Sequence, residues 1–114
     1  MLFRSQGLAA AGYTAGSVPI LRAQRFVAEM MLRQGDLEAA WAQSAVVVEK
    51  LVSQSGNTAI ELGQALALQS RIEAQRGHAS QAERLHARAL ELLRQQLPAD
   101  HPLLARAPTA KAVL

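Results

Sequence analysis

Apolar residues recur along this 114-residue chain with the spacing of amphipathic helices. Four segments show this pattern: Pro19–Arg33, Leu37–Val52, Ala59–Arg76 and Ala79–Leu97. In the second and fourth segments, apolar and small residues fall at i, i+3, i+4 and i+7, which places them on one helix face. Connections of only a few residues between such helices force neighbours to run antiparallel. The pattern therefore predicts an all-α fold of helical hairpins.

Capping residues support the proposed helix ends. Ser17 and Asp36 are expected N-caps, and Thr58 followed three residues later by Glu61 matches a capping box. Pro98 ends the fourth segment, and Asp100-His101-Pro102 is a start signal for a further helix.

The chain is similar to itself at an offset of 42 residues, which pairs Gly35 with Gly77. Each glycine lies between two periodic segments, where a left-handed residue after a helix end is least costly for glycine. Other pairs are Ala23/Ala65, Phe26/Leu68, Ala28/Ser70, Met30/Ile72, Ala40/Ala82, Ala45/Ala87, Glu49/Glu91 and Leu51/Leu93. The offset predicts one repeat over 17–57 and a second over 58–101. Residues 1–16 are then a lead or the end of a preceding helix, and 102–114 the start of a further helix or a tail.

The stretch Ala82–Leu93, with the following turn Leu97–Pro102, resembles the second helix and inter-repeat turn of a tetratricopeptide repeat. It is most similar to the long variant, with a period near 42, of kinesin light chains and many bacterial regulators. Gly35–Ala40 resembles the turn within such a repeat, and the resemblance covers about residues 18–105. It implies a short α-solenoid that acts as a protein–protein interaction scaffold. Spacing alone also fits other helical-hairpin repeats, such as HEAT-type units.

The chain departs from the family at positions where aromatic residues are usual. Met31 and Glu73 stand there in the first helix of each repeat, and Ser44 and His86 in the second helix. Stacked repeats need about three units for independent stability, whereas only two fit here. We therefore expect a fragment of a larger array, or a chain that completes its core by self-association.

In this family the first helix of each repeat lines a concave groove that holds a peptide. Transferred by position, the resemblance implies a binding surface of Arg22, Arg25, Glu29, Arg33, Gln64, Arg71 and Gln75. A groove with excess arginine suits an acidic peptide or a C-terminus, because the guanidinium fork can donate two hydrogen bonds to one carboxylate. The alternative is that these side chains form ordinary solvated helix faces, whose exposed ion pairs contribute only about 0–1 kcal/mol. The lysine and asparagine clamp of chaperone-binding members is not matched.

Val46, Val47 and Val48 point around most of a helix, so at least one of them should be exposed unless something covers it. Trp41, which pairs with Glu83 at the 42-residue offset, is an apolar residue at a position expected to be solvated. One explanation is a strap from Leu2, Phe3 and Leu8 that packs there. The alternative is an interface through Trp41, Val46 and Val48 in a small all-α homo-oligomerisation domain.

Composition narrows the functional classes. The chain has no cysteine and no apolar run of about 18 residues, so thiol chemistry and a membrane-spanning helix are excluded. Its net charge of +3 comes mainly from arginines spread among glutamates, whereas nucleic-acid binders concentrate basic charge on one face. We expect a cytoplasmic protein that binds a protein or peptide, with nucleic acid an unlikely partner.

No catalytic or metal site emerges from the residue pattern. His78 and His86 are eight residues apart, unlike the i, i+4 spacing that puts two metal ligands on one helix face. Asp36 and Asp100 have the positions of helix caps, and no nucleophile elbow or phosphate loop is present. We expect no enzyme activity, no cofactor and no bound metal.

Overall fold

The computed structural model describes residues 17–54 and 58–105. Their regular secondary structure is helical, which confirms the all-α prediction. The helices are α2 (Val18–Arg33), α3 (Leu37–Ser53), α4 (Ala59–Gln75), α5 (Ala79–Gln96) and the short α6 (Pro102–Ala105). The ends of the four long helices fall within one residue of the predicted ones. The predicted lead 1–16, with the strap from Leu2, Phe3 and Leu8, lies outside the described residues, as does 106–114 of the predicted tail.

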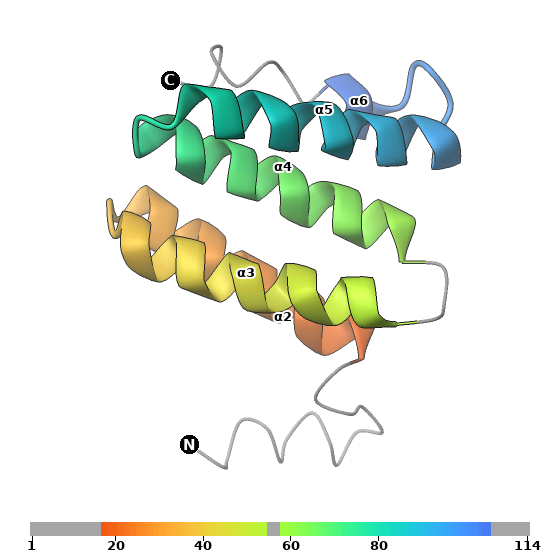
Figure 1. Cartoon of the computed structure of the whole chain (residues 1–114). Helices are drawn as coiled ribbons and strands as arrows, with labels where there is room; N and C mark the ends of the chain where they lie inside the picture. Colours follow the sequence, from red (N-terminus) through yellow and green to blue (C-terminus); the bar gives the residue numbers. More distant parts are fainter. Residues whose placement is uncertain (1–16, 55–57, 106–114) are drawn as a thin grey trace.

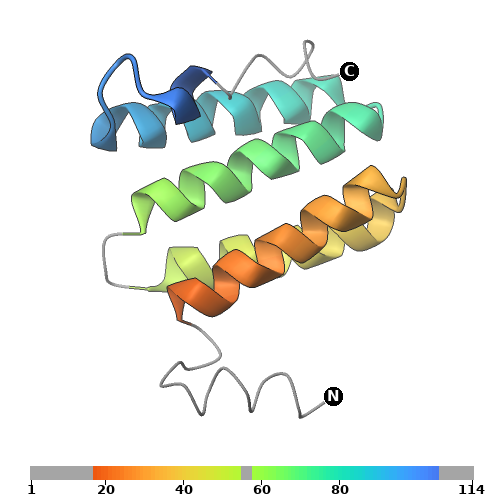
Figure 2. The same cartoon turned by 180° about the vertical axis from the view of Figure 1, so that it is seen from behind.

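The four long helices form two hairpins that lie on one another. Figure 1 shows α2 and α3 together on one side, α4 in the middle, and α5 on the far side of α4. Seen from behind in Figure 2, α2 and α6 both lie toward the viewer, one on each side of α4. The face formed by α2, α4 and α6 is therefore distinct from the face on which α3 is seen.

The two hairpin turns have the same backbone geometry. Gly35 and Gly77 have φ angles of 82° and 86°. Each glycine N–H donates to the carbonyl three residues earlier, and the next N–H donates to the carbonyl five residues earlier. This is the Schellman arrangement, in which a left-handed residue satisfies the last carbonyls of a helix. The predicted role of both glycines is confirmed.

Only one of the three predicted N-caps works as expected. The Asp36 side chain accepts a hydrogen bond from the Ala39 N–H at 3.3 Å. Ser17 and Thr58 occupy N-cap positions, but neither side chain caps its helix. The Thr58 hydroxyl instead donates to the Leu51 carbonyl at 3.3 Å, at the end of α3. The predicted capping box is therefore wrong, because the Thr58 hydroxyl and the Glu61 carboxylate are both engaged with other helices.

Two buried clusters of the described residues lie between the first hairpin and α4, and a smaller one joins Ala74 of α4 to Ala82 of α5. One cluster joins Ala28 and Leu32 of α2 and Ala40 of α3 to Leu68 and Ile72 of α4. A second cluster contains Leu21, Val47, Leu51 and Ala65. Because α4 also packs closely on α5, it is the most buried helix of the described chain.

Candidate functional site: a groove between α2, α4 and α6

A groove of about 320 Å³ runs along α4, on the side where Figure 2 shows α2 and α6. Four of the seven residues predicted from the family resemblance line it. They are Arg25 and Glu29 of α2 and Gln64 and Arg71 of α4. The other lining residues are Phe26, Ala67, Leu68, Leu93 and Leu103. The groove thus has an apolar floor with charged and amide groups around it, a combination typical of binding sites.

Arg22 ties α2 to α4 beside this groove. Its Nη2 lies 2.9 Å from Glu61 Oε2, and its Nε lies 3.3 Å from Glu61 Oε1. The hydrogen bond and then the charge of Glu61 raise the pKa of Arg22. Because two of its nitrogens already bond the Glu61 carboxylate, Arg22 serves first to position the helices.

Glu29 is shared by two arginines. Arg33 Nη2 lies 3.2 Å from Glu29 Oε2, one turn along the same helix, and Arg71 Nη1 of α4 lies 3.8 Å from the same oxygen. The longer distance to Arg71 exceeds that of a hydrogen bond, so Arg71 makes a weaker contact. A ligand carboxylate could compete with Glu29 for it.

Arg25 differs from the other groove arginines. Its guanidinium lies 4.9 Å from the centre of the Phe26 ring, and its Nε is buried without a hydrogen-bond partner. Burial is the main cause that lowers the pKa of Arg25, although nearby Glu61 and Glu29 act in the opposite direction. No carboxylate of the described residues lies within ion-pair distance of it. A partly desolvated cation of this kind gains from an added anionic partner.

The remaining predicted residues lie outside the lining. Arg33 and Gln75 are exposed at the C-terminal ends of α2 and α4, and Arg22 is held by Glu61. Sequence reasoning missed the apolar floor, in particular Phe26, Leu68 and Leu103. The pair Phe26/Leu68 at the 42-residue offset was the available signal, because equivalent residues on two stacked first helices face the same side.

The residues of the predicted interface lie in different environments. Trp41 is partly buried, packs against the core cluster of Ala28 and Leu32, and has the Arg76 guanidinium 5.4 Å from its ring. Val48 packs against the second cluster, whereas Val46 is 43% exposed. An interface through these three residues stays a prediction.

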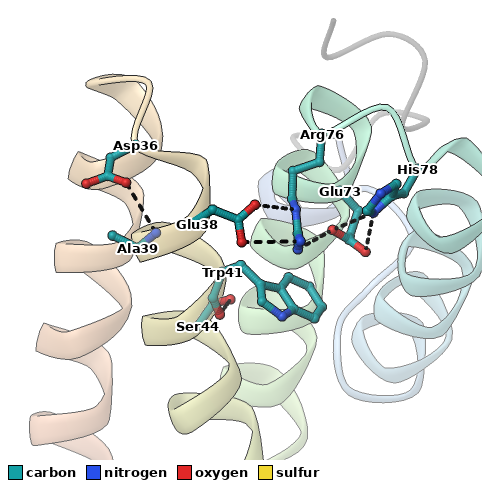
Figure 3. A network of polar contacts seen from close by, with 8 residues as sticks. All are labelled: Asp36, Glu38, Ala39, Trp41, Ser44, Glu73, Arg76 and His78. Carbon is teal, nitrogen blue, oxygen red and sulfur yellow. Dashed lines mark hydrogen bonds and ion pairs between the residues drawn. The ribbon is translucent and has the colours of Figure 1, made fainter.

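A buried carboxylate forms the centre of a second polar group, drawn in Figure 3. Glu73 is 3% exposed, and it accepts a hydrogen bond from Arg76 Nη1 at 2.9 Å. His78 Nδ1 lies 3.2 Å from the other oxygen of Glu73, and Arg76 Nε lies 3.3 Å from Glu38 Oε2 on α3. The sequence marked Glu73 only as a departure from an aromatic position. The charged Arg76 three residues later was the signal for this ion pair.

The contacts within this polar group indicate that it stabilises the fold. Both oxygens of Glu73 are occupied, and Arg76 bridges α3 and α4 while covering Trp41. Among the described residues, no three histidine, aspartate or glutamate side chains gather closely enough to hold a metal ion. Within the same residues, no helix has the length and apolar character needed to cross a membrane.

Comparison with known proteins adds no relative. The chain matches no protein-family model, no curated protein and no solved structure.

Proposed function

We propose that this chain is a non-catalytic protein-interaction scaffold of the tetratricopeptide type, which binds a peptide segment in the groove between α2, α4 and α6. The observation that carries the proposal is the pairing of groove residues at the 42-residue offset. Phe26 and Leu68 are equivalent and both line the groove, as do Glu29 and Arg71. Stacked repeats place equivalent residues of successive first helices along one shared surface.

The chemistry of the groove favours an acidic ligand with apolar side chains. Two arginines, Arg25 and Arg71, line it against one carboxylate, that of Glu29. Arg25 has no carboxylate partner among the described residues, and Arg71 has only the 3.8 Å contact with Glu29. A peptide carboxylate between these two arginines would give the partly buried Arg25 guanidinium an anionic partner, while an apolar neighbour covers the exposed ring of Phe26.

Selection from a displayed library of random peptides on the immobilised full chain tests this directly. We expect selected peptides to be enriched in Asp and Glu beside Leu, Ile or Phe. Their affinities would be measured by fluorescence anisotropy. The double substitution Arg25→Glu and Arg71→Glu should weaken them at least about tenfold, the loss of about one charge-assisted contact.

The matched control is Arg84→Glu with Arg88→Glu, which changes the net charge equally on the exposed face of α5. This control should change the peptide affinity less than about twofold, because salt screens exposed charges that lie outside the groove. An equal loss of peptide affinity in both double variants would mean that acidic peptides are attracted by the net positive charge of the chain. That result would contradict a binding site in the groove. Failure of the library to yield any peptide that binds would contradict it as well.

A further inference from the structure

The outer face of α2 carries a stripe of exposed apolar side chains. Phe26 is 52% exposed, Val27 42% and Met30 58%, and Ala23 is exposed beside them. Positions i, i+3, i+4 and i+7 lie on one side of a helix, so these four residues form a single face. We call this stripe, Ala23, Phe26, Val27 and Met30, the α2 end face. Contiguous exposed apolar surface of this kind marks interaction sites.

The residues 42 positions later, on α4, show how the equivalent face of the second hairpin packs. The equivalents on α4 are Ala65, Leu68, Gln69 and Ile72, and their exposed fractions are 1%, 4%, 4% and 0%. Leu68 and Ile72 pack on Ala28, Leu32 and Ala40, and Ala65 packs on Val47 and Leu51. The α4 face is therefore the surface by which the second hairpin packs on the first. The α2 end face has the same position in its own hairpin, and it is exposed.

The opposite end of the stack of hairpins, where α5 lies, is polar rather than apolar. The outward side of α5 is exposed and charged, with Glu83, Arg84, Arg88 and Glu91. α6 also packs on α5, and its residue Leu104 is the equivalent of Leu62 at the start of α4. The place that a following hairpin would take is thus partly occupied by the chain itself. Head-to-tail stacking of two copies would set the apolar α2 end face against α6 and charged residues of α5.

We propose that the α2 end face packs on the same face of a second copy, which gives a closed two-fold dimer with the charged α5 surfaces outside. An interface that joins a patch to itself needs no complementary second surface, and such two-fold dimers are the commonest oligomers. One apolar end and one polar end in the same molecule favour this closed form over an open chain of copies. The inference does not rest on the proposed peptide groove, but the Phe26 ring belongs to both surfaces, so dimerisation and peptide binding compete for it.

Sedimentation equilibrium of the full chain up to about 200 µM tests the dimer. We expect a dimer whose dissociation constant rises at least about tenfold on Met30→Glu, because a carboxylate would have to enter an apolar contact. Met30 is 58% exposed in the single chain, so the variant should keep its helical circular dichroism. Val52→Glu is the matched control, since Val52 is an apolar residue of α3 that is 64% exposed, slightly more than Met30.

A cross-linking experiment tests whether the α2 end face lies at the dimer interface. The chain has no cysteine, so Val27→Cys introduces a single thiol. Under mild oxidation it should form a disulfide-linked dimer much faster than Val52→Cys does.

Three results would overturn the proposal. The first is a monomer at every concentration up to about 200 µM, and the second is a dimer that Val52→Glu weakens as much as Met30→Glu does. The third is a dimer that appears only after residues 1–16 are deleted, because those residues would then cover the face in the intact chain.

Discussion

In the first hairpin, α2 and α3 contribute Leu21, Leu32 and Val47 to the core, whereas the equivalent positions of the second hairpin hold Gly63, Ala74 and Ala89. The turns of the two hairpins match closely, yet the helices inside them pack differently. α4 and α5 approach so closely that a Cβ atom at Gly63 would lie 2.9 Å from Leu93 Cγ. The difference teaches that the repeat sets helix length and turn geometry, while side-chain volume sets how near the two helices come.

The hairpins also differ in how they use charge. Met31 of α2 packs against the core, whereas its equivalent on α4 is Glu73, which is buried with Arg76 and His78 around it. The first hairpin is joined mainly by apolar contact, and the second adds a buried ion pair that also reaches α3 through Glu38.

Gly63→Leu places in the second hairpin the residue that the first hairpin has at Leu21. We expect it to lower the free energy of unfolding by about 3 kcal/mol, because the added side chain overlaps Leu93 and the Ala89 carbonyl. The gain in helix propensity from losing a glycine, about 1 kcal/mol, offsets only part of this strain. Urea unfolding followed by circular dichroism measures the change.

Ala87→Leu is the control for Gly63→Leu, since it adds side-chain volume at an exposed position of α5. It should change the stability by less than about 0.5 kcal/mol. If Gly63→Leu unfolds at the same urea concentration as the parent chain, the close approach of α4 and α5 is wrong.

Arg76→Ala removes the main partner of the buried Glu73. We expect a loss of about 2 kcal/mol at neutral pH, less than for a fully buried pair because Arg76 is partly exposed and His78 still contacts the carboxylate. Glu73→Met, which copies Met31 of the first hairpin, should change stability by no more than about 1 kcal/mol, since replacing a buried ion by an apolar residue is often neutral.

The double variant with Glu73→Met and Arg76→Ala distinguishes an ion pair from simple packing. If the loss in Arg76→Ala comes from an uncompensated carboxylate, the double variant should be more stable than Arg76→Ala alone. Additive losses in the same urea experiment would show instead that the Arg76 side chain acts through its packing on Trp41.

Helix positions were predictable because they depend on local signals. Apolar periodicity located all four long helices, and the left-handed glycines at Gly35 and Gly77 fixed the turns between them. The capping box at Thr58 failed because a cap depends on which partner a side chain meets in three dimensions. There the Thr58 hydroxyl contacts Leu51 of the preceding helix, and no local pattern encodes that contact.

The groove was predictable only in part, for a related reason. Family resemblance suggested a set of polar positions on α2 and α4, but it did not say which of them already have partners. Arg22 is held by Glu61, 39 residues away in the chain, whereas Arg25 is half-buried on Phe26. Contacts between distant residues decide which arginine is available, and periodicity carries no information about them.

The turns provide a test of what the two hairpins have in common. Gly35→Ala and Gly77→Ala should each lower the free energy of unfolding by about 1 kcal/mol, the strain of an L-residue at positive φ. No atom lies within 4 Å of an added Cβ at either glycine, so backbone strain is the whole effect in both places. Thermal unfolding of the two variants should give nearly equal shifts, and a difference above about 1 kcal/mol would mean that the turns are not equivalent.

The smallest effect concerns His86 of α5, whose equivalent in the first hairpin is Ser44. Burial, and then the charge of Arg94, lowers the pKa of His86 below its ordinary value of 6.5. In a pH range just below 6.5 the unfolded chain therefore binds a proton that the folded chain does not, so stability falls as the pH decreases through this range. The ring is partly exposed, so solvent screening keeps the contribution below about 1 kcal/mol. His86→Ser should reduce the difference in unfolding free energy between about pH 5 and pH 8. An unchanged difference would mean that His86 is as well solvated in the folded chain as in the unfolded one.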